Sequence, residues 1–176
     1  ILATDTARLP KLKQKLTAAQ RRWVEASDFE GREHTHCAVP GSKGEVEFVL
    51  AGVRDGVDPW ALAHLPLQLA PGHYSLGKGP VALDEDMAAF GWALGSYQYT
   101  RYKKPRRKPA HLQLGAAAKV TQALGLAEAV KLVRDLVNTP AEDMGPAELA
   151  DIVREQADLF GAEFDEWVGD ELLAQN

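Results

Sequence analysis

The nitrogen and sulfur side chains best suited to binding a metal ion lie close together, as His34, His36 and Cys37. On a strand His34 and His36 would share one face, a spacing compatible with metal binding. A structural zinc site needs four ligands, however, and no second cysteine or paired histidine follows. We therefore favour half-exposed histidines on a β-hairpin over a metal site. The other histidines, His64, His73 and His111, are scattered near predicted turns.

Several carboxylates that could suggest acid and base chemistry are neighbours in the sequence. Examples are the pairs Glu142-Asp143, Asp165-Glu166 and Asp170-Glu171. Adjacent residues do not share a face of a helix or a strand, so these pairs are interpreted as solvated charge. No local serine, histidine and acid order suggests a nucleophile, and no glycine-rich loop suggests a nucleotide site.

One segment, RYKKPRRK at 101–108, holds six of the twenty basic residues and no acid. We call it the basic loop. It could contact nucleic-acid phosphates, with Pro105 and Pro109 keeping it extended. The candidate nucleic-acid-binding residues are Lys103, Lys104, Arg106, Arg107 and Lys108. The remainder of the chain carries a net charge of −11, so the loop could equally dock on acidic surface of the same chain or of a neighbouring subunit.

Length and composition set limits on the elements that position these residues. The 176 residues, 45% of them apolar, suffice for one domain, or for one domain and the start of a second. The single cysteine excludes an internal disulfide and fits a reducing compartment. No signal peptide or membrane span is evident, so we expect a soluble cytoplasmic protein. Ile1 is expected to be a boundary or a trimmed end.

Hydrophobic periodicity predicts mixed helices and strands in the first half. A basic amphipathic helix is expected over 10–22, a hairpin over 34–53, a turn at 54–59 with a helical turn or two after it, and a brief strand within 71–77. A helix is expected over 83–104, with Met87, Phe90, Leu94 and Tyr97 on one face. Its small residues, including Gly91 and Gly95, would let another element approach closely.

A series of helix, helix, strand and helix is expected in the second half. The short strand AHLQL at 110–114 precedes a long helix from about 116 to 137, which Thr139-Pro140 ends. A helix follows over 146–160, with Gly161 beyond it, then a strand at 162–169 and the start of a helix. The buried face of helix 146–160 is expected to hold Leu149, Ile152, Val153, Leu159 and Phe160.

Two segments resemble a known family. GWALGSYQYTRYKK is similar to the last helix of the leucyl aminopeptidase N-terminal domain, G-x-x-L-G-x-Y-x-F-x-x-Y-K, with Tyr99 where phenylalanine is common. LVRDLVNTPAEDMGPAELADIVREQADLFG resembles the N-x-P-A break and the M-x-P-x-x-L-A helix start at the entrance to the catalytic domain. The second match fixes Asn138, Pro140, Ala141, Met144, Pro146, Leu149 and Ala150 at the family's spacing.

The resemblance implies an α/β protein with three parts. They are a mixed-sheet, macro-domain-like N-terminal domain over 1–112, a linking helix over 113–138, and the incomplete start of an α/β catalytic domain over 139–176. It also implies a cytoplasmic, commonly hexameric enzyme that releases N-terminal amino acids from peptides. Two divalent metal ions, zinc or manganese, would be bound by the motifs G-K-G-x-x-x-D-T-G-G and N-T-D-A-E-G-R.

Neither metal motif occurs in these 176 residues. GKGPVALD at 77–84 echoes the first, but its lysine and aspartate are one residue too far apart and no glycine pair follows. We therefore expect no catalytic or metal-binding residue here. We expect this part of the protein to have an architectural role in a peptidase. The alternative is a module that binds nucleic acid or another ligand through the basic loop.

Overall fold

The computed structural model describes residues 1–115 and 120–175, and its first unit is built on a mixed sheet. Strands β1 (Leu2–Thr4), β3 (Val46–Gly52) and β2 (His36–Pro40) lie in the order β1-β3-β2. β2 and β3 pair antiparallel, which confirms the predicted hairpin, and β1 pairs parallel to β3. β1 was not predicted, because a strand of three residues is too short to show a period.

The first unit also contains a separate, two-stranded sheet. β4 (His73–Ser75) and β5 (His111–Gln113) pair in parallel. They lie within the two short strands predicted at 71–77 and 110–114. Backbone hydrogen bonds connect the end of β4 and the segment after it to Ile1, which precedes β1: the Ile1 nitrogen donates to Ser75 O at 2.6 Å, and Gly77 N donates to Ile1 O at 2.7 Å. The predicted α/β class with a mixed sheet is confirmed.

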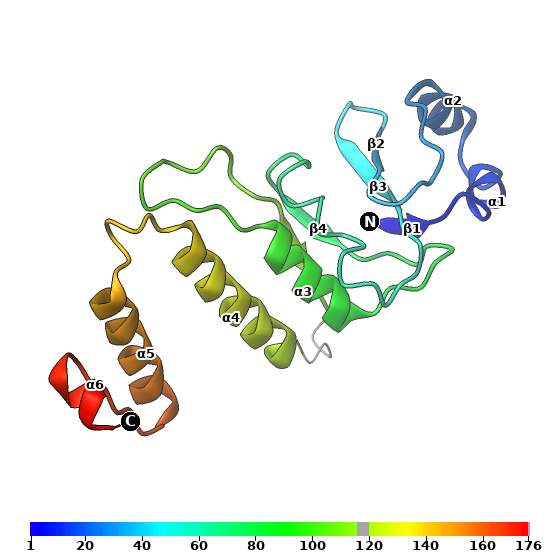
Figure 1. Ribbon diagram of the computed structural model, residues 1–176. Helices are drawn as coiled ribbons and strands as arrows, with labels where there is room; N and C mark the ends of the chain where they lie inside the picture. Colours follow the sequence, from blue (N-terminus) through cyan, green and yellow to red (C-terminus); the bar gives the residue numbers. More distant parts are fainter. Residues whose placement is uncertain (116–119, 176) are drawn as a thin grey trace. The chain divides into compact units, whose positions relative to one another are not determined.

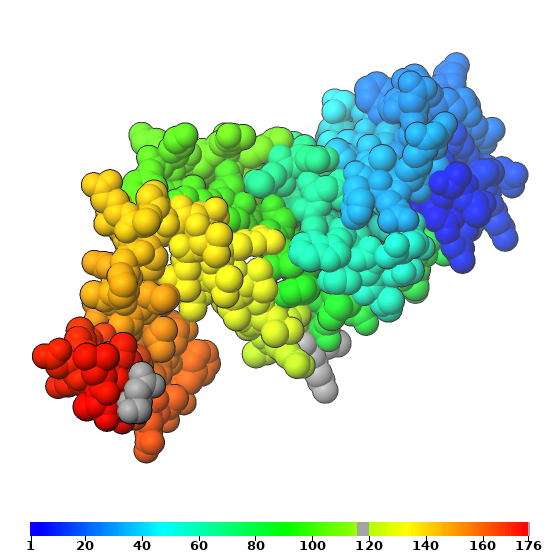
Figure 2. Space-filling model, in the orientation of Figure 1, coloured from blue at the N-terminus to red at the C-terminus, as the bar shows by residue number. Residues whose placement is uncertain are grey.

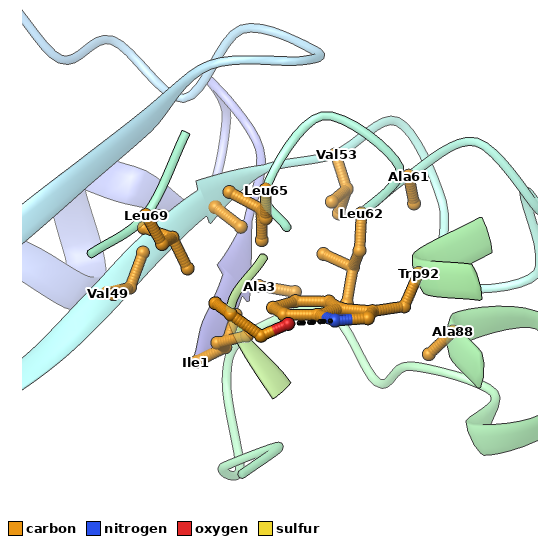
Figure 3. Close-up of a cluster of buried hydrophobic side chains, with 12 residues drawn as sticks. Ile1, Ala3, Val49, Val53, Ala61, Leu62, Leu65, Leu69, Ala88 and Trp92 are labelled. Atoms are coloured by element: carbon orange, nitrogen blue, oxygen red, sulfur yellow. Dashed lines mark hydrogen bonds between the residues drawn. The ribbon is translucent and has the colours of Figure 1, made fainter. Parts of the chain in front are cut away.

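Apolar side chains alternate between the two faces of the first sheet, as the pleat of a strand requires. Val49 and Ala51 enter one core, and Leu50 between them enters the other. The first core is completed by the turns over 59–69 and by helix α3 (Glu85–Gly95), whose Trp92 indole lies across it in Figure 3. The second core is covered by α1 (Leu9–Lys13) and α2 (Ala18–Ala26).

The single helix expected over 10–22 is wrong, because the chain forms two helices, α1 and α2. Thr17 separates them: its hydroxyl accepts from Gln20 N at 3.3 Å, and the Gln20 side chain accepts from Thr17 N at 3.0 Å. This reciprocal pair is a capping box, which satisfies backbone donors at the start of α2.

Helix α3 is shorter than the helix expected over 83–104, since it ends at Gly95. The predicted close approach at its glycines is confirmed. A Cβ added at Gly91 would lie 1.9 Å from Pro59 O, and one at Gly95 would lie 1.8 Å from Ala63 O. The predicted apolar face is only partly right, because Met87 and Phe90 are half-buried while Ala88, Ala89 and Trp92 are buried.

Between β3 and β4 the chain forms turns rather than the expected helical turn or two. The Asp55 carboxylate accepts from Asp58 N at 2.8 Å, and the Asp58 carboxylate accepts from Trp60 N at 2.9 Å. Successive backbone bonds of three-residue span follow from Ala61 to Gln68. These turns bury Leu62 and Leu65 beneath α3 without forming a regular helix.

The chain divides into two compact units, residues 1–131 and 132–176, and helix α4 (Thr121–Asn138) crosses the boundary. Residues 116–119, where the long helix was expected to begin, lie outside the described residues. α4 ends before Thr139-Pro140 as predicted, and α5 (Pro146–Phe160) occupies the predicted range with Gly161 in the left-handed region at φ 65°. The three-part domain division stays a prediction.

The second unit contains α5 and α6 (Asp170–Ala174) but not the strand expected over 162–169, which is irregular. A strand needs a neighbouring strand to pair with its backbone, and the described part of this unit contains none. The expected buried face of α5 is also wrong, since Leu149, Val153, Leu159 and Phe160 are 45–77% exposed. Only Thr139 and Ala157 are buried among the unit's described residues.

Candidate functional site

The basic loop connects α3 to β5 and stands out from the rest of the first unit (Figure 1). α3 ends where the Ser96 hydroxyl donates to Trp92 O at 2.8 Å. The far end of the loop returns to the same helix, because the Trp92 indole donates to Ala110 O at 3.0 Å. Residues 101–108 are all exposed, as predicted, and they belong to the green part of the surface in Figure 2.

Gln98 holds the two sides of the loop together. Its amide nitrogen donates to Arg107 O at 2.9 Å, and its amide oxygen accepts from Arg106 N at 3.0 Å. The Gln98 side chain thus both donates to and accepts from the backbone of the opposite side of the loop, as a neighbouring strand would do. The loop therefore has a defined shape at its base although it is exposed.

Arg107 anchors the loop to the turns that precede β4. Its guanidinium donates to Leu67 O at 2.7 Å and to Leu69 O at 3.1 Å. A charged donor to a backbone carbonyl is among the stronger hydrogen bonds in a protein. Part of the charge predicted to meet nucleic acid is therefore used within the chain.

A groove of about 500 Å³ runs along the loop, and it brings together most of the predicted site residues. Lys103, Lys104, Arg106 and Arg107 line it, together with aromatic rings of Tyr97 and Tyr99, whereas Lys108 is exposed outside its lining. The Tyr99 and Tyr102 ring centroids lie 5.9 Å apart, and the Arg101 guanidinium lies 5.7 Å from the Tyr102 centroid. Cations beside aromatic rings are the chemistry that holds a single-stranded nucleic acid.

The fold assembles a histidine cluster that was not predicted from the sequence. The His64 ring centroid lies 5.9 Å from that of His34 and 5.8 Å from that of His36. Burial, and then the proximity of His36 and His34, together lower the pKa of His64 to about 4. About 30 residues separate His64 from the other two, so no local spacing could have indicated the contact.

Within residues 1–115 and 120–175, no group of three or more histidines, cysteines and acids could hold a metal ion. Cys37 is a free, buried thiol, and burial raises its pKa. Acids of two of the pairs have other partners or positions: Glu166 pairs with Arg154 at 2.7 Å, and Asp170 and Glu171 lie in the first turn of α6. Acidic side chains in the first turn are stabilised by the positive end of the helix dipole.

Comparison with known proteins places this α/β unit in a class. A family model described as "M17 aminopeptidase, N-terminal domain" matches residues 2–115. The chain belongs to the M17 aminopeptidase family, which confirms the resemblance found in its sequence. Among the described helices, none is long and apolar enough to span a membrane.

Relatives and solved structures agree with this placement. A probable cytosol aminopeptidase of Corynebacterium diphtheriae is 31% identical over 150 residues, which cover 74% of this chain and 30% of that protein. The crystal structure of cytosol aminopeptidase from Coxiella burnetii matches with a TM-score of 0.81 and 35% identity, over 92% of this chain and 36% of that one. The bottromycin maturation enzyme BotP in complex with Mn shares the fold, with a TM-score of 0.71 at 24% identity. The chain thus spans about a third of the length of these proteins.

Proposed function

We propose that these residues are the N-terminal part of a metal-dependent, leucyl-type aminopeptidase, which releases N-terminal amino acids from peptides. The observation that carries the proposal is the likeness to the Coxiella burnetii cytosol aminopeptidase. It extends over 92% of the chain, beyond the N-terminal domain match that ends at residue 115. The helix break at Thr139-Pro140 and the start of α5 at Pro146 lie beyond residue 115.

We assign the hydrolytic chemistry to a region outside these 176 residues. The relatives are about three times as long, and the described residues do not offer a cluster fit to hold a metal ion. When bound, two divalent ions would activate water and polarise the peptide carbonyl. Manganese and zinc are the expected ions, and the BotP structure with Mn supports a divalent metal. No side chain described here is given a catalytic role.

The proposed role of this region is architectural. Its second unit exposes large apolar side chains, with Val137, Phe160 and Leu173 each more than 70% exposed. Surface of this kind is characteristic of a site that contacts further polypeptide. We therefore infer that the region covers one side of the catalytic domain and helps arrange subunits, in a hexamer located in the cytoplasm.

The test uses the full-length protein that contains this chain. Purified with manganese or zinc, it should release leucine from a leucyl peptide with a free amino terminus. The N-acetylated form of the same peptide should stay intact, because aminopeptidases act at a free terminus. Metal removal by a chelator should abolish turnover, and added metal should restore it. Turnover of both peptides alike, or of neither under any metal, would refute the proposal.

A second candidate function is nucleic-acid binding at the groove of the basic loop. The observation that favours it is the combination of Lys103, Lys104 and Arg106 with the tyrosine rings along one groove. Contacts of this kind release counterions, so binding should weaken steeply with salt.

The variant Lys103→Ala/Lys104→Ala/Arg106→Ala tests this candidate without disturbing Arg107. It should reduce the salt-dependent shift of a labelled single-stranded oligonucleotide at least about tenfold. The control variant Arg22→Ala/Arg32→Ala/Lys43→Ala removes the same charge at exposed positions outside both grooves and should leave the shift unchanged. Equal losses in both variants would show that only net charge matters, which would exclude a site at the loop.

A further inference from the structure

A second groove, of about 580 Å³, lies between α1 and the segment that follows β4. A volume of this size is typical of sites for small molecules. The groove is lined by nine residues, all of them in the first unit. It shares no residue with the groove of the basic loop.

The lining is strongly basic on one side. Arg8, Lys11 and Lys15 come from α1 and its flanks at spacings of three and four, which place side chains on the same face of a helix. Lys78 contributes a fourth cation, and no acid lines the groove. Arg8 is already paired with Asp5. In the part of the chain that the structure describes, Lys11, Lys15 and Lys78 form no ion pair.

Lys78 is held beside this helix by the glycines on either side of it. Gly77 N donates to Ile1 O at 2.7 Å, and Val81 N donates to Ala3 O at 3.1 Å, so the segment runs along β1. A Cβ added at Gly79 would lie 2.4 Å from Ala3 O, which shows how closely the backbone approaches the strand. The string Gly77-Lys78-Gly79, which does not form a metal motif, thus places a cation opposite α1.

The rest of the lining is apolar. Leu12 is buried, and Leu2 and Leu16 are partly buried against the second core, so they form a fixed apolar wall. Because three ammonium groups without an ion pair line one groove, a bound anion would be attracted by all of them. Ammonium groups bind phosphate as point charges, and the apolar wall suits an organic body attached to it.

We propose that this groove binds a small organic phosphate, with Lys11, Lys15 and Lys78 on the phosphate and Leu2, Leu12 and Leu16 against the organic part. A nucleic acid suits the groove less well, because no aromatic side chain lines it for a base to stack on. The inference does not depend on the peptidase assignment, since it uses no residue of a hydrolytic site.

The experiment compares two probes with the same head group, inorganic phosphate and hexyl phosphate, by amide NMR titration of the 176-residue chain. Hexyl phosphate should shift the amides of residues 8–16 and 77–81 in a saturable way. It should bind at least about tenfold more tightly than inorganic phosphate, because only it reaches the apolar wall. Binding should weaken as salt is added.

Two charge-matched variants decide the outcome. Lys11→Ala/Lys15→Ala/Lys78→Ala should weaken hexyl phosphate binding at least about tenfold, whereas Arg22→Ala/Arg32→Ala/Lys43→Ala, at exposed positions outside both grooves, should leave it unchanged. Unchanged melting temperatures would show that both variants fold. The proposal is overturned if shifts do not saturate, if they fall equally on the basic loop, or if both variants lose binding alike. It is also overturned if only vesicles of phosphatidylcholine with phosphatidate, or only a single-stranded oligonucleotide, bind at these residues.

Discussion

The imidazole of His64 has two buried nitrogens without a hydrogen bond of ordinary geometry to any described residue. Burial, followed by the proximity of His36 and His34, lowers its pKa to about 4, and the Thr35 backbone opposes the shift. Protonation in the folded state would place a charge in a partly buried position beside the imidazoles of His36 and His34. The folded protein therefore favours the neutral ring.

The first prediction concerns the variant His64→Leu. The pKa of His64 is lower in the folded state than in the unfolded state, so the unfolded chain binds more protons between pH 6.5 and 4. The wild-type stability should fall as pH drops through this range, by about 1–2 kcal/mol after allowance for solvent screening. His64→Leu should remove that loss, as measured by urea unfolding at pH 7 and pH 4.5. His73→Leu, at an exposed position, should keep the wild-type dependence, and a matching slope in all three proteins would contradict the account.

A second prediction at this scale separates structural from exposed charge in the basic loop. Arg107→Ala removes the donors to Leu67 O and Leu69 O, so the loop should detach from the turns beneath it. Hydrogen exchange at the amides of Arg106 and Ala110 should accelerate, with a stability loss on the order of 1 kcal/mol. Arg106→Ala, whose side chain lines the groove, should leave these exchange rates as they are. Slow exchange in both variants would show that Arg107 does not anchor the loop.

The sequence indicated the charge of this loop, but not that Arg107 anchors the loop to the turns that precede β4. Six bases among eight residues made an exposed loop predictable, whereas the partners of Arg107 lie about 40 residues away. The same limit applies to His64, whose neighbours are set by how the turns over 59–69 pack on the sheet. Contacts between distant segments are fixed by tertiary packing, which no local spacing encodes.

At the scale of single elements, α3 depends on glycine for its contact with the turns beneath it. Gly91→Ala would force a methyl group to within 1.9 Å of Pro59 O. The gain in helix propensity, up to about 1 kcal/mol, cannot offset such an overlap. We predict a net loss of about 2 kcal/mol in the free energy of unfolding, measured with urea.

Gly125 of α4 provides the matched control, because a Cβ added there meets nothing within 4 Å. Gly125→Ala should stabilise the protein by about 0.5–1 kcal/mol, through helix propensity alone. Equal effects of the two substitutions would mean that α3 does not need its glycines for packing.

Elements were predictable where local signals and tertiary structure agree. Proline at the start of α5 and Gly161 at its end fixed both boundaries. The break between α1 and α2 was missed although Thr17 and Gln20 have capping-box spacing, because the apolar period continues across them. On α3 the large apolar side chains of Met87 and Phe90 were expected in the core. The close packing of this helix instead favours alanine and glycine there.

At the scale of the whole molecule, the second unit has almost no core of its own. Its α5 exposes Leu149, Val153 and Phe160, and only Thr139 and Ala157 are buried among its described residues. A helix without a packed face has little to protect its backbone. The unit is therefore expected to rely on polypeptide beyond this chain.

Hydrogen exchange tests that expectation. In the isolated chain the amides of α5 should exchange within seconds to minutes, while those of β3 in the first unit stay protected. In the full-length protein α5 should become protected by at least about a hundredfold. Strong protection of α5 in the isolated chain would show that the unit is stable by itself and would remove this argument for its architectural role.

The family was predictable because its motifs are local, and the spacing from Asn138 to Ala150 can be recognised in a single sequence. The irregular stretch over 162–169 was not, since its alternating pattern forms a strand only beside another strand.

The most direct test of the central claim compares the full-length protein with residues 1–176 at equal concentration, by release of leucine from a leucyl peptide in the presence of manganese. Turnover by the full-length protein, with none by residues 1–176, is the predicted result. Metal-dependent turnover by residues 1–176 alone would contradict the account, because it would locate a hydrolytic centre among side chains to which we assign none.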